Sequence, residues 1–484
     1  MDPTPAIDID IDADPRITGE YLRHVSSGDG TLVLVGVVHD HPASVYRVRR
    51  VVEAVGPDVL DELTDRLRPL TSVDPGETGT DLAPIGDVAA DVDVFGMGEG
   101  SHGTREFFRA KHRLFRFLVE EHGFRLLGIE ANVAAGTAIN DYVLRGEGSA
   151  EAALSQGSLH AVYRTESVLE LVEWISEFNE GRPEADRVRV HGFDVQDSVA
   201  PVTGLERYFE GVDPEPLRDL TTEIEQLTGT HTANVLDDEA TLKSRLEARS
   251  AVVTRLGDAL EANEREYCER TSRREYERAR RLVWVIERGY KQYQATLDEA
   301  GGVESMRIRD EAMAEQVRWL LDHESAERIA IWAHNAHLGR TGVVHPKISP
   351  ATRAQVPSLG AHLAESDELD YATLQLSLGG GTVRSAYVPE REFRAYEMDD
   401  PPSGSLPAVF GEVGEPLFFL NTSEVPSESA LGAWFDSDPT DYVITGKYEE
   451  TPVKHVSLDP KAEFDGVLFV SETTTAESFT ADDR

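Results

Sequence analysis

The sequence predicts an α/β protein: a mostly parallel sheet with flanking helices, interrupted by an inserted subdomain of long helices. Three observations support this class. From about residue 91, apolar runs of strand length alternate with helical patterns, which is typical of parallel strands joined by crossover helices. Residues 204–325 break the alternation, because they contain long stretches with almost no glycine or proline. After residue 326 the alternation of strands and helices resumes.

The N-terminal part of the chain reads as a tail, a small unit and a linker. Residues 1–15 are acidic, and we expect them to be disordered. Residues 16–68 contain the apolar strand "TLVLVGVVHDH", a helical pattern, a turn and the strand-like "DVLDEL", which carries Glu62. Residues 69–84, "PLTSVDPGETGTDLAP", are rich in turn formers and predict a linker.

The predicted core occupies residues 85–203 and 326–478. Its first part contains the strand "VDVFGMGEG", a helix over 104–122, the strand "FRLLGIEAN", helices through 150–180 and the strand "RVRVHGFDVQ". Its second part contains the strand patterns "RIAIWAHNAHLGR", "YATLQLSLGGGT", "PLFFLN" and "FDGVLFVSETT". The helical insertion, 204–325, separates the two parts.

The charge of the chain excludes two classes of partner. With 47 basic and 89 acidic residues the net charge is −42, and such a surface repels both nucleic acid and anionic membranes. No apolar run is long enough to cross a membrane, and the acidic start is unlike a signal peptide, so we expect a cytoplasmic protein. The single cysteine, Cys268, allows neither an intrachain disulfide nor a cysteine-based zinc site.

The same composition predicts a halophilic source with an acidic proteome. Only seven of the 47 basic residues are lysine. In about 1 M salt the Debye length shrinks to about 3 Å, which screens the self-repulsion of so acidic a surface. We therefore expect the thermal unfolding midpoint to rise as KCl is added, measured by circular dichroism from low to molar salt. A midpoint that is highest in low salt would contradict a halophilic origin.

Polar side chains follow four of the predicted strands. In open parallel sheets, ligands bind outside the carboxyl ends of the strands, so residues at these positions are expected to meet. An aspartate at such a position can also serve only to cap the next helix, and this alternative stays open for Asp194. The residues at the four strand ends are Glu99 and His102, Glu130, Asp194, and finally His334, Asn335 and His337.

The residue types favour hydrolysis by an activated water. His102 lies just before a helix N-terminus, whose positive end disfavours the imidazolium, and a neutral histidine can take a proton from water. Glu99 or Glu130 is placed to orient the other ring nitrogen and to stabilise the charge that forms. His337 is expected to face His102 and to donate to a developing oxyanion.

Lys111 falls on the apolar side of the predicted helix, three residues after Phe108 and four before Phe115. An unpaired buried ammonium is costly, so we expect carboxylates to hold it, with Glu130 nearby. The alternative is that the side chain extends to the surface.

No nucleophile other than water is predicted. Ser101 does not fit the G-x-S-x-G pattern and is expected to help the turn or to cap the helix, while Cys268 reads as inert. We predict no metal and no cofactor, because neither "EGSH" nor "HNAH" is an H-E-x-x-H helix motif. Two alternatives remain: a metal-dependent hydrolase on the same scaffold, and a non-catalytic small-molecule-binding or cell-envelope-related protein.

From about residue 85 to 478 the chain resembles the erythromycin esterase family. The motifs that carry the resemblance are "GEGSHGTREFFRAKHRL", "EEHGFRLLGIEAN", "YRTESVLELVEWISEFN", "HGFDVQ", "RIRDEAMAEQVRWLL", "IAIWAHNAHLGR", "SLGAHL" and "FDGVLFVSETT". The resemblance implies an α/β core with helical additions and metal-independent hydrolysis of a macrocyclic lactone ester. It makes His102 the base that activates water, with Glu99, Glu130 and a histidine of "AHNAH" completing the site.

We therefore predict an esterase or lactonase that acts on a small-molecule ester or lactone, with a role in macrolide resistance. The predicted catalytic residues are His102, Glu99, Glu130, His337, His334 and Lys111, with His337 preferred over His334. The predicted substrate-binding residues are Asp194, Arg164 and Asn335.

Residues 31–63 separately resemble the start of the TraB-like (pheromone-shutdown) family. The pattern is "LVGVVHDHPASVYRVRRVVEAVGPDVLDEL", with a G-x-x-H motif, a helix, P-D-x-V and a terminal E-L. The rest of that family is missing, so we interpret the segment, with His39 and Glu62, as a vestigial or structural unit.

Overall fold

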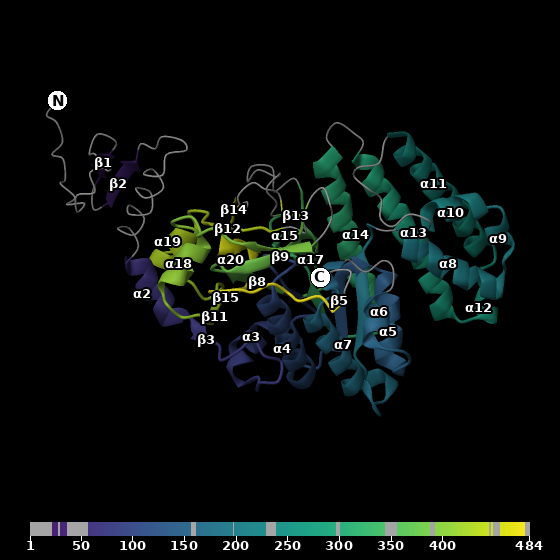
Figure 1. The fold of residues 1–484 in the computed structure, drawn as a ribbon, viewed down its shortest axis with the longest axis horizontal. Helices are drawn as coiled ribbons and strands as arrows, with labels where there is room; N and C mark the ends of the chain where they lie inside the picture. Colours follow the sequence, from purple (N-terminus) through teal and green to yellow (C-terminus); the bar gives the residue numbers. More distant parts are fainter. Residues whose placement is uncertain are drawn as a thin grey trace.

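The computed structural model describes most of the chain, and an eight-stranded sheet forms its centre (Figure 1). The described residues are 22–27, 30–35, 57–155, 161–196, 198–228, 239–296, 301–343, 356–387, 393–444, 447–448 and 455–479. Within these ranges, none of the helices combines the length and apolarity that a bilayer crossing requires.

The sheet is mostly parallel, as predicted. Its strand order is β3-β11-β15-β8-β4-β7-β5-β6, and β4, β7, β5, β6, β8 and β15 pair in parallel. Only β11, next to the edge strand β3, is reversed, and it pairs antiparallel with both β15 and β3. The strands are β3 (Arg68–Pro69), β4 (Val94–Met97), β5 (Leu126–Asn132), β6 (Arg189–Asp194), β7 (Ile329–Trp332), β8 (Tyr371–Leu378), β11 (Leu417–Asn421) and β15 (Gly466–Val470).

Helices cover both faces of the sheet, which explains why its central strands are apolar throughout. Successive side chains of a strand point to opposite faces, so Phe95 joins one hydrophobic cluster and Val94 the other. Helices on the Phe95 face are α3 (Ala83–Ala89), α4 (Arg105–Glu121), α5 (Ala135–Arg145), α6 (Ala150–Leu154) and α7 (Glu166–Asn179). Helices on the Val94 face are α2 (Pro57–Arg66), α14 (Gly301–Glu324), α17 (Leu359–Ala364), α18 (Leu406–Glu412) and α19 (Ala430–Phe435).

The predicted helical insertion forms its own bundle at one end of the molecule (Figure 1). It has a separate hydrophobic cluster that includes Leu205, Val252 and Tyr276. Its helices are α8 (Val199–Val212), α9 (Glu215–Arg218), α10 (Thr221–Thr228), α11 (Glu239–Ala262), α12 (Glu264–Arg270) and α13 (Arg273–Ala295). The last helix, α14, packs against both α13 and the sheet, so it links the bundle to the core.

Shorter elements complete the chain. The strands outside the large sheet are β1 (Leu22–Ser27), β2 (Gly30–Val35), β9 (Thr382–Tyr387), β10 (Phe393–Glu397), β12 (Thr440–Tyr442), β13 (Lys447–Tyr448) and β14 (His455–Ser457). The remaining helical turns are η2 (Thr80–Leu82), η3 (Ala161–Tyr163), η4 (Glu184–Asp186), α15 (Asn335–Leu338) and α20 (Pro460–Glu463).

The segment "DVLDEL" is helical, so the prediction of a strand there was wrong. Val59, Leu60 and Leu63 recur at helical spacing, and Leu63 is fully buried in the core cluster. The carboxylate of Glu62 accepts hydrogen bonds from the backbone N–H groups of Ala430 and Leu431, at the start of α19. Glu62 therefore has a structural role, while His39 lies outside the described residues and the TraB-like resemblance stays a prediction.

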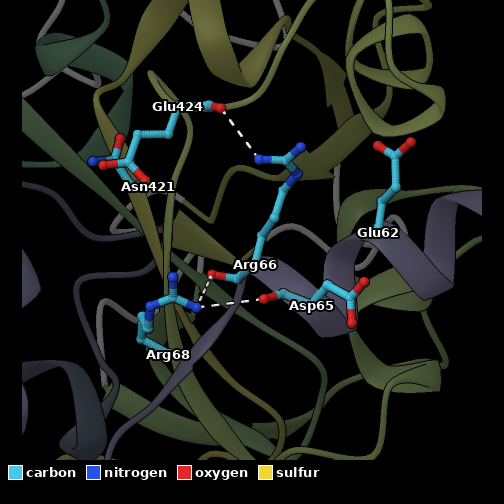
Figure 2. Close-up of a pocket in the computed structure, with 6 residues that line it drawn as sticks. All are labelled: Glu62, Asp65, Arg66, Arg68, Asn421 and Glu424. Atoms are coloured by element: carbon cyan, nitrogen blue, oxygen red, sulfur yellow. Dashed lines mark hydrogen bonds between the residues drawn. The ribbon is translucent and has the colours of Figure 1, made fainter.

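A surface pocket of about 300 Å³ lies beside Glu62. Figure 2 shows that its two arginines are already bound: Arg66 donates to the carbonyl of Glu424, and Arg68 to that of Asp65. These contacts fasten α2 to the loop after β11.

The predicted linker is held against α4. The buried guanidinium of Arg113 donates to the carbonyls of Ser72 and Thr78 and to the carboxylate of Asp81. Asp81 also accepts from the backbone and hydroxyl of Thr71. The turn-rich segment therefore forms a loop, and Arg113 fixes the path of that loop over α4.

Candidate active site

The predicted site residues gather where the parallel strands end. In register, Met97 of β4 and Ile129 of β5 both lie beside Trp332 of β7, so the loops after these strands start at the same level. The backbone joins the loops: the N–H of Asn335 donates to the carbonyl of Glu99 at 2.8 Å. The N–H of His334 donates to the carboxylate of Glu130, also at 2.8 Å. The expected convergence is therefore present.

His102 is oriented by Glu99. Its Nδ1 lies 2.6 Å from Glu99 Oε1, and the Glu99 side chain is fully buried whereas that of His102 is 17% exposed. Burial works to raise the pKa of Glu99, but Lys111 and His102 outweigh it and lower the pKa, so the carboxylate is ionised. An ionised carboxylate only accepts, so Nδ1 carries the proton and the lone pair of neutral His102 is on Nε2.

The loop that presents His102 depends on a glycine and a serine. A Cβ on Gly103 would lie 1.6 Å from the carbonyl oxygen of Arg384, so no other residue fits. Ser101 is buried, and its hydroxyl accepts from the backbone N–H of Gly103. Ser101 thus stabilises the turn, as predicted, and the turn delivers His102 just before α4 begins at Arg105.

Lys111 is fully buried on α4, which excludes the surface alternative. Its Nζ donates to Glu99 Oε2 at 2.5 Å and lies 4.4 Å from the ring centre of Trp332. Trp332 Nε1 donates to the same carboxylate oxygen at 2.8 Å. Burial outweighs the attraction of Glu99 and lowers the pKa of Lys111 to about 8. Glu99 is the direct partner of Lys111, whereas Glu130 attracts the ammonium without a hydrogen bond to it.

Arg309, on α14, is the centre of a second charge network that the sequence did not predict. Its guanidinium donates twice to Asp194, at 3.1 and 2.9 Å, and once to Glu130 at 2.7 Å. Its third nitrogen lies 3.0 Å from His337 Nε2. Burial disfavours ionised Glu130, but His337 and Arg309 outweigh burial and hold its pKa well below the ordinary value.

Asp310, the next residue on α14, fixes His337. Asp310 Oδ1 accepts from His337 Nδ1 at 2.8 Å and from the backbone N–H of Leu359 at 2.9 Å. Burial disfavours the imidazolium, but Asp310 and Glu130 outweigh it and raise the pKa of His337. The sequence could have indicated that Asp310 is buried, because it lies at helical spacing from the apolar Met306 and Met313. Lys111 occupies the same kind of position on the apolar face of α4.

His334 has both ring nitrogens occupied by backbone. Nε2 donates to the carbonyl of Ile444 at 3.2 Å, and Nδ1 accepts from the N–H of Ala336 at 3.1 Å. Its ring lies 4.9 Å from that of His102. Burial, together with the nearby His102, lowers the pKa of His334 to about 3. The His334 ring is therefore neutral, and it packs beside His102 without acting as an acid or base.

The three residues predicted to bind substrate make contacts within the chain. Asp194 is fully buried and bound by Arg309 and by the backbone N–H of Val195. The Asn335 amide spans the backbone of Leu376, donating to its carbonyl and accepting from its N–H. Arg164 follows η3, and its carbonyl accepts from Ser478. These contacts organise the protein, and substrate binding by the three residues stays a prediction.

Tyr163 is a further residue that the sequence did not single out. It is 1% exposed, its ring packs edge-on against Trp332 at 6.0 Å, and its hydroxyl has no hydrogen-bond partner in the described part of the chain. Burial, then the fields of Glu130 and Glu99, raise its pKa well above the ordinary value. Tyr163 therefore stays protonated and offers an unused O–H donor beside the carboxylates.

Metal coordination is the alternative chemistry for this site. Among the described residues, no group of three or more histidine, cysteine, aspartate or glutamate side chains is arranged to hold a metal ion. The buried carboxylates instead bind cations of the chain: Glu99 binds Lys111, and Glu130 and Asp194 bind Arg309.

Asp441, on β12 near the site, is a buried carboxyl with a predicted effect on stability. It accepts from Ser377, Gln375 and the backbone of Tyr442, yet burial outweighs these bonds and raises its pKa to about 7. A carboxyl with a raised folded-state pKa stabilises the fold when protonated, and this contribution is lost as the pH rises from about 4 to about 7.

We expect Asp441→Asn to unfold with a higher free energy than wild type at pH 8, by a few kcal/mol, and to converge with it near pH 4. The carbonyl oxygen of Gln375 has no partner and can accept from the new amide after a side-chain flip. Urea unfolding at pH 4.5, 6 and 8 measures the difference. Parallel pH profiles of the two proteins would show that Asp441 does not titrate in this range.

The fold and this site define the class: an α/β protein whose mostly parallel sheet carries, at its carboxyl edge, a carboxylate-oriented histidine and buried cation–carboxylate pairs. The chain belongs to the erythromycin esterase family, whose model matches residues 119–473. Glu99, His102 and Lys111 precede the matched residues, so geometry alone joins them to the part that matches.

Known proteins agree with this assignment. The chain is 22% identical over 389 residues to erythromycin esterase type II of Escherichia coli, covering 73% of this chain and 86% of that protein. A Bacillus cereus protein of known crystal structure superposes with a TM-score of 0.71 at 22% identity, over 87% of this chain and 98% of that one. A mutant of the erythromycin esterase EreC in its open conformation gives 0.64 at 16% identity, over 86% and 98%.

Proposed function

We propose that this protein hydrolyses a carboxylic ester or lactone with a water molecule activated by His102. The observation that carries the proposal is the buried, ionised Glu99 bound to Nδ1 of His102, the more exposed partner of the pair. No described residue hydrogen-bonds to Nε2, so this nitrogen is free to take a proton from water. Lys111 and Trp332 hold Glu99 from behind and so fix the orientation of the imidazole.

In the proposed reaction, a water oxygen attacks the ester carbonyl while its proton passes to His102 Nε2. The tetrahedral intermediate then collapses, the bond to the alkoxy oxygen breaks, and the imidazolium returns the proton to that leaving group. Two ionised carboxylates stabilise the transient imidazolium: Glu99 by contact and Glu130 through its field. Arg309 keeps Glu130 ionised throughout.

We propose that Tyr163 donates a hydrogen bond to the oxyanion. A buried hydroxyl without a partner costs about 1–3 kcal/mol, which a developing negative charge would offset. We expect Tyr163→Phe to lower kcat by about 10- to 100-fold with a smaller change in KM, and to make the fold at least as stable as wild type, because the unpartnered hydroxyl is removed. Steady-state kinetics and thermal unfolding check this. An unchanged kcat would assign the oxyanion contact elsewhere.

The name of one relative supports a proposal for the substrate class. The Escherichia coli relative is named for erythromycin, a macrocyclic lactone. We therefore extend the proposal to macrolides and to a role in macrolide resistance, with simpler esters as probes of the same chemistry.

The proposal is tested by acid release from p-nitrophenyl butyrate, a simple lactone and erythromycin, with and without EDTA. We expect hydrolysis of at least one substrate at a rate that EDTA does not change. Loss of activity in EDTA and its return with Zn²⁺ or Mn²⁺ would favour the metal-dependent alternative. Failure to hydrolyse any ester would overturn the proposal.

A further inference from the structure

A second cleft lies between the core and the helical insertion, apart from the candidate active site. It has a volume of about 840 Å³, and its walls come from α5 and α6 on one side and α8, α13 and α14 on the other. None of the predicted catalytic residues lines it, nor does Arg309. The edge strand β6 contributes His191 to its floor.

One wall of this cleft holds buried donors that have no acceptor in the described part of the chain. Arg281 on α13 is 8% exposed and Gln316 on α14 is fully buried. Arg281 Nε donates to Gln316 Oε1, and because a guanidinium can only donate, this bond fixes which end of the amide is oxygen. Arg281 Nη2 and Gln316 Nε2 are then left without a partner among the residues that the structure describes.

Such an arrangement is costly unless a ligand completes it. Burying a donor without an acceptor costs free energy, and here two such donors belong to residues that line one cleft. The unused nitrogens of Arg281 and Gln316 belong to groups that are directly hydrogen-bonded to each other, so a single acceptor group can reach both.

The positive charge of Arg281 is also only partly compensated. Its nearest carboxylate, Glu315, is 3.7 Å away and lies closer to Arg288, at 2.8 Å. The face of the Arg281 guanidinium stacks on Trp284, 3.4 Å from the ring centre. Burial, which these charges do not fully offset, lowers the pKa of Arg281 to about 10. An anion at the free edge of the guanidinium would supply the missing charge.

The rest of the cleft decides which anion fits. One guanidinium nitrogen and one amide nitrogen match the two oxygens of a carboxylate. Glu275 and Glu324 also line the cleft, and they disfavour a dianion such as phosphate. Apolar surface lies alongside, from Trp319, Leu282 and Leu320.

We propose that this cleft binds an organic monocarboxylate. Its carboxylate accepts from Arg281 and Gln316, and its apolar part lies along Trp319, Leu282 and Leu320. The proposal is independent of the ester hydrolysis proposed above, because the two sites share no residue.

The test uses hexanoate as the probe and Gln316→Glu as the variant. The new glutamate is close to isosteric and places a carboxylate against Arg281, so it occupies the position of the ligand. In wild type we expect hexanoate to change the tryptophan fluorescence saturably, through Trp319, and to raise the thermal unfolding midpoint. In Gln316→Glu we expect at least about tenfold weaker binding and a higher midpoint without ligand.

Three controls make the result specific. Hexanamide, which lacks the charge, should not bind, and Arg280→Met, an exposed arginine outside the cleft, should bind as wild type does. Binding should persist in His102→Ala, because a carboxylate is also the product of ester hydrolysis. Absence of saturable hexanoate binding to wild type, or unchanged binding to Gln316→Glu, would overturn the proposal.

Discussion

His102→Ala is expected to lower kcat for ester hydrolysis by about 10²–10⁴-fold, with a much smaller change in KM. The reason is that the imidazole acts on the attacking water in the transition state and contributes less to holding the substrate. Its removal also leaves Glu99 bound to Lys111 and Trp332, so the core of the site keeps its charge balance. Steady-state kinetics on the substrate that wild type hydrolyses best give both constants.

The matched control is His122→Ala. His122 lies at the other end of the same helix, is partly exposed and touches none of the site residues. We expect it to retain the kcat of wild type, and both variants to keep the circular dichroism spectrum of the native fold. If His102→Ala retained more than about a tenth of the wild-type kcat, a general base other than His102 would have to be sought.

Lys111→Met is expected to lower the free energy of unfolding by about 3–5 kcal/mol, because it leaves the fully buried Glu99 without its cation. Methionine fills much of the same volume, so the loss of charge dominates over any cavity. Urea denaturation at fixed salt and pH 7 measures the effect, provided that the slope m is unchanged. We also expect the variant to lose activity, because a destabilised Glu99 takes up a proton and no longer fixes His102.

Two further variants separate charge from packing. Lys291→Met removes an exposed lysine that pairs with Glu287 on the helix surface, and it should change stability by less than about 0.5 kcal/mol. Adding Glu99→Gln to Lys111→Met removes both charges and should recover part of the lost stability. If Lys111→Met were no less stable than Lys291→Met, the buried pair would not hold this part of the core.

The sequence was most informative where one physical rule acts over a short stretch of chain. Strand and helix periodicity predicted the parallel sheet, its order of elements along the chain and the long-helix insertion. The rule that parallel strands present their carboxyl ends at one edge predicted that Glu99, His102, Glu130 and His334 would meet. Lys111 on an apolar helix face predicted a buried ion pair.

Prediction from the sequence was wrong for a short segment in which strand and helix periods are hard to tell apart. "DVLDEL" is only six residues long and was predicted to be strand-like, whereas Leu67 beyond its end continues the helical spacing from Val59, Leu60 and Leu63. The packing of Leu63 into the core decided for the helix.

By itself, the sequence determined the class of fold, the family and most of the polar residues at the sheet edge, because local hydrophobic period and strand-end position do not depend on distant parts of the chain. Only the tertiary structure decided their partners. Arg309 and Asp310 come from the inserted helices. Arg309 binds Asp194 although the two residues are 115 positions apart in the sequence. Which carboxylate a cation joins, and which imidazole nitrogen stays free, depend on distances of a few ångströms between segments that periodicity cannot relate.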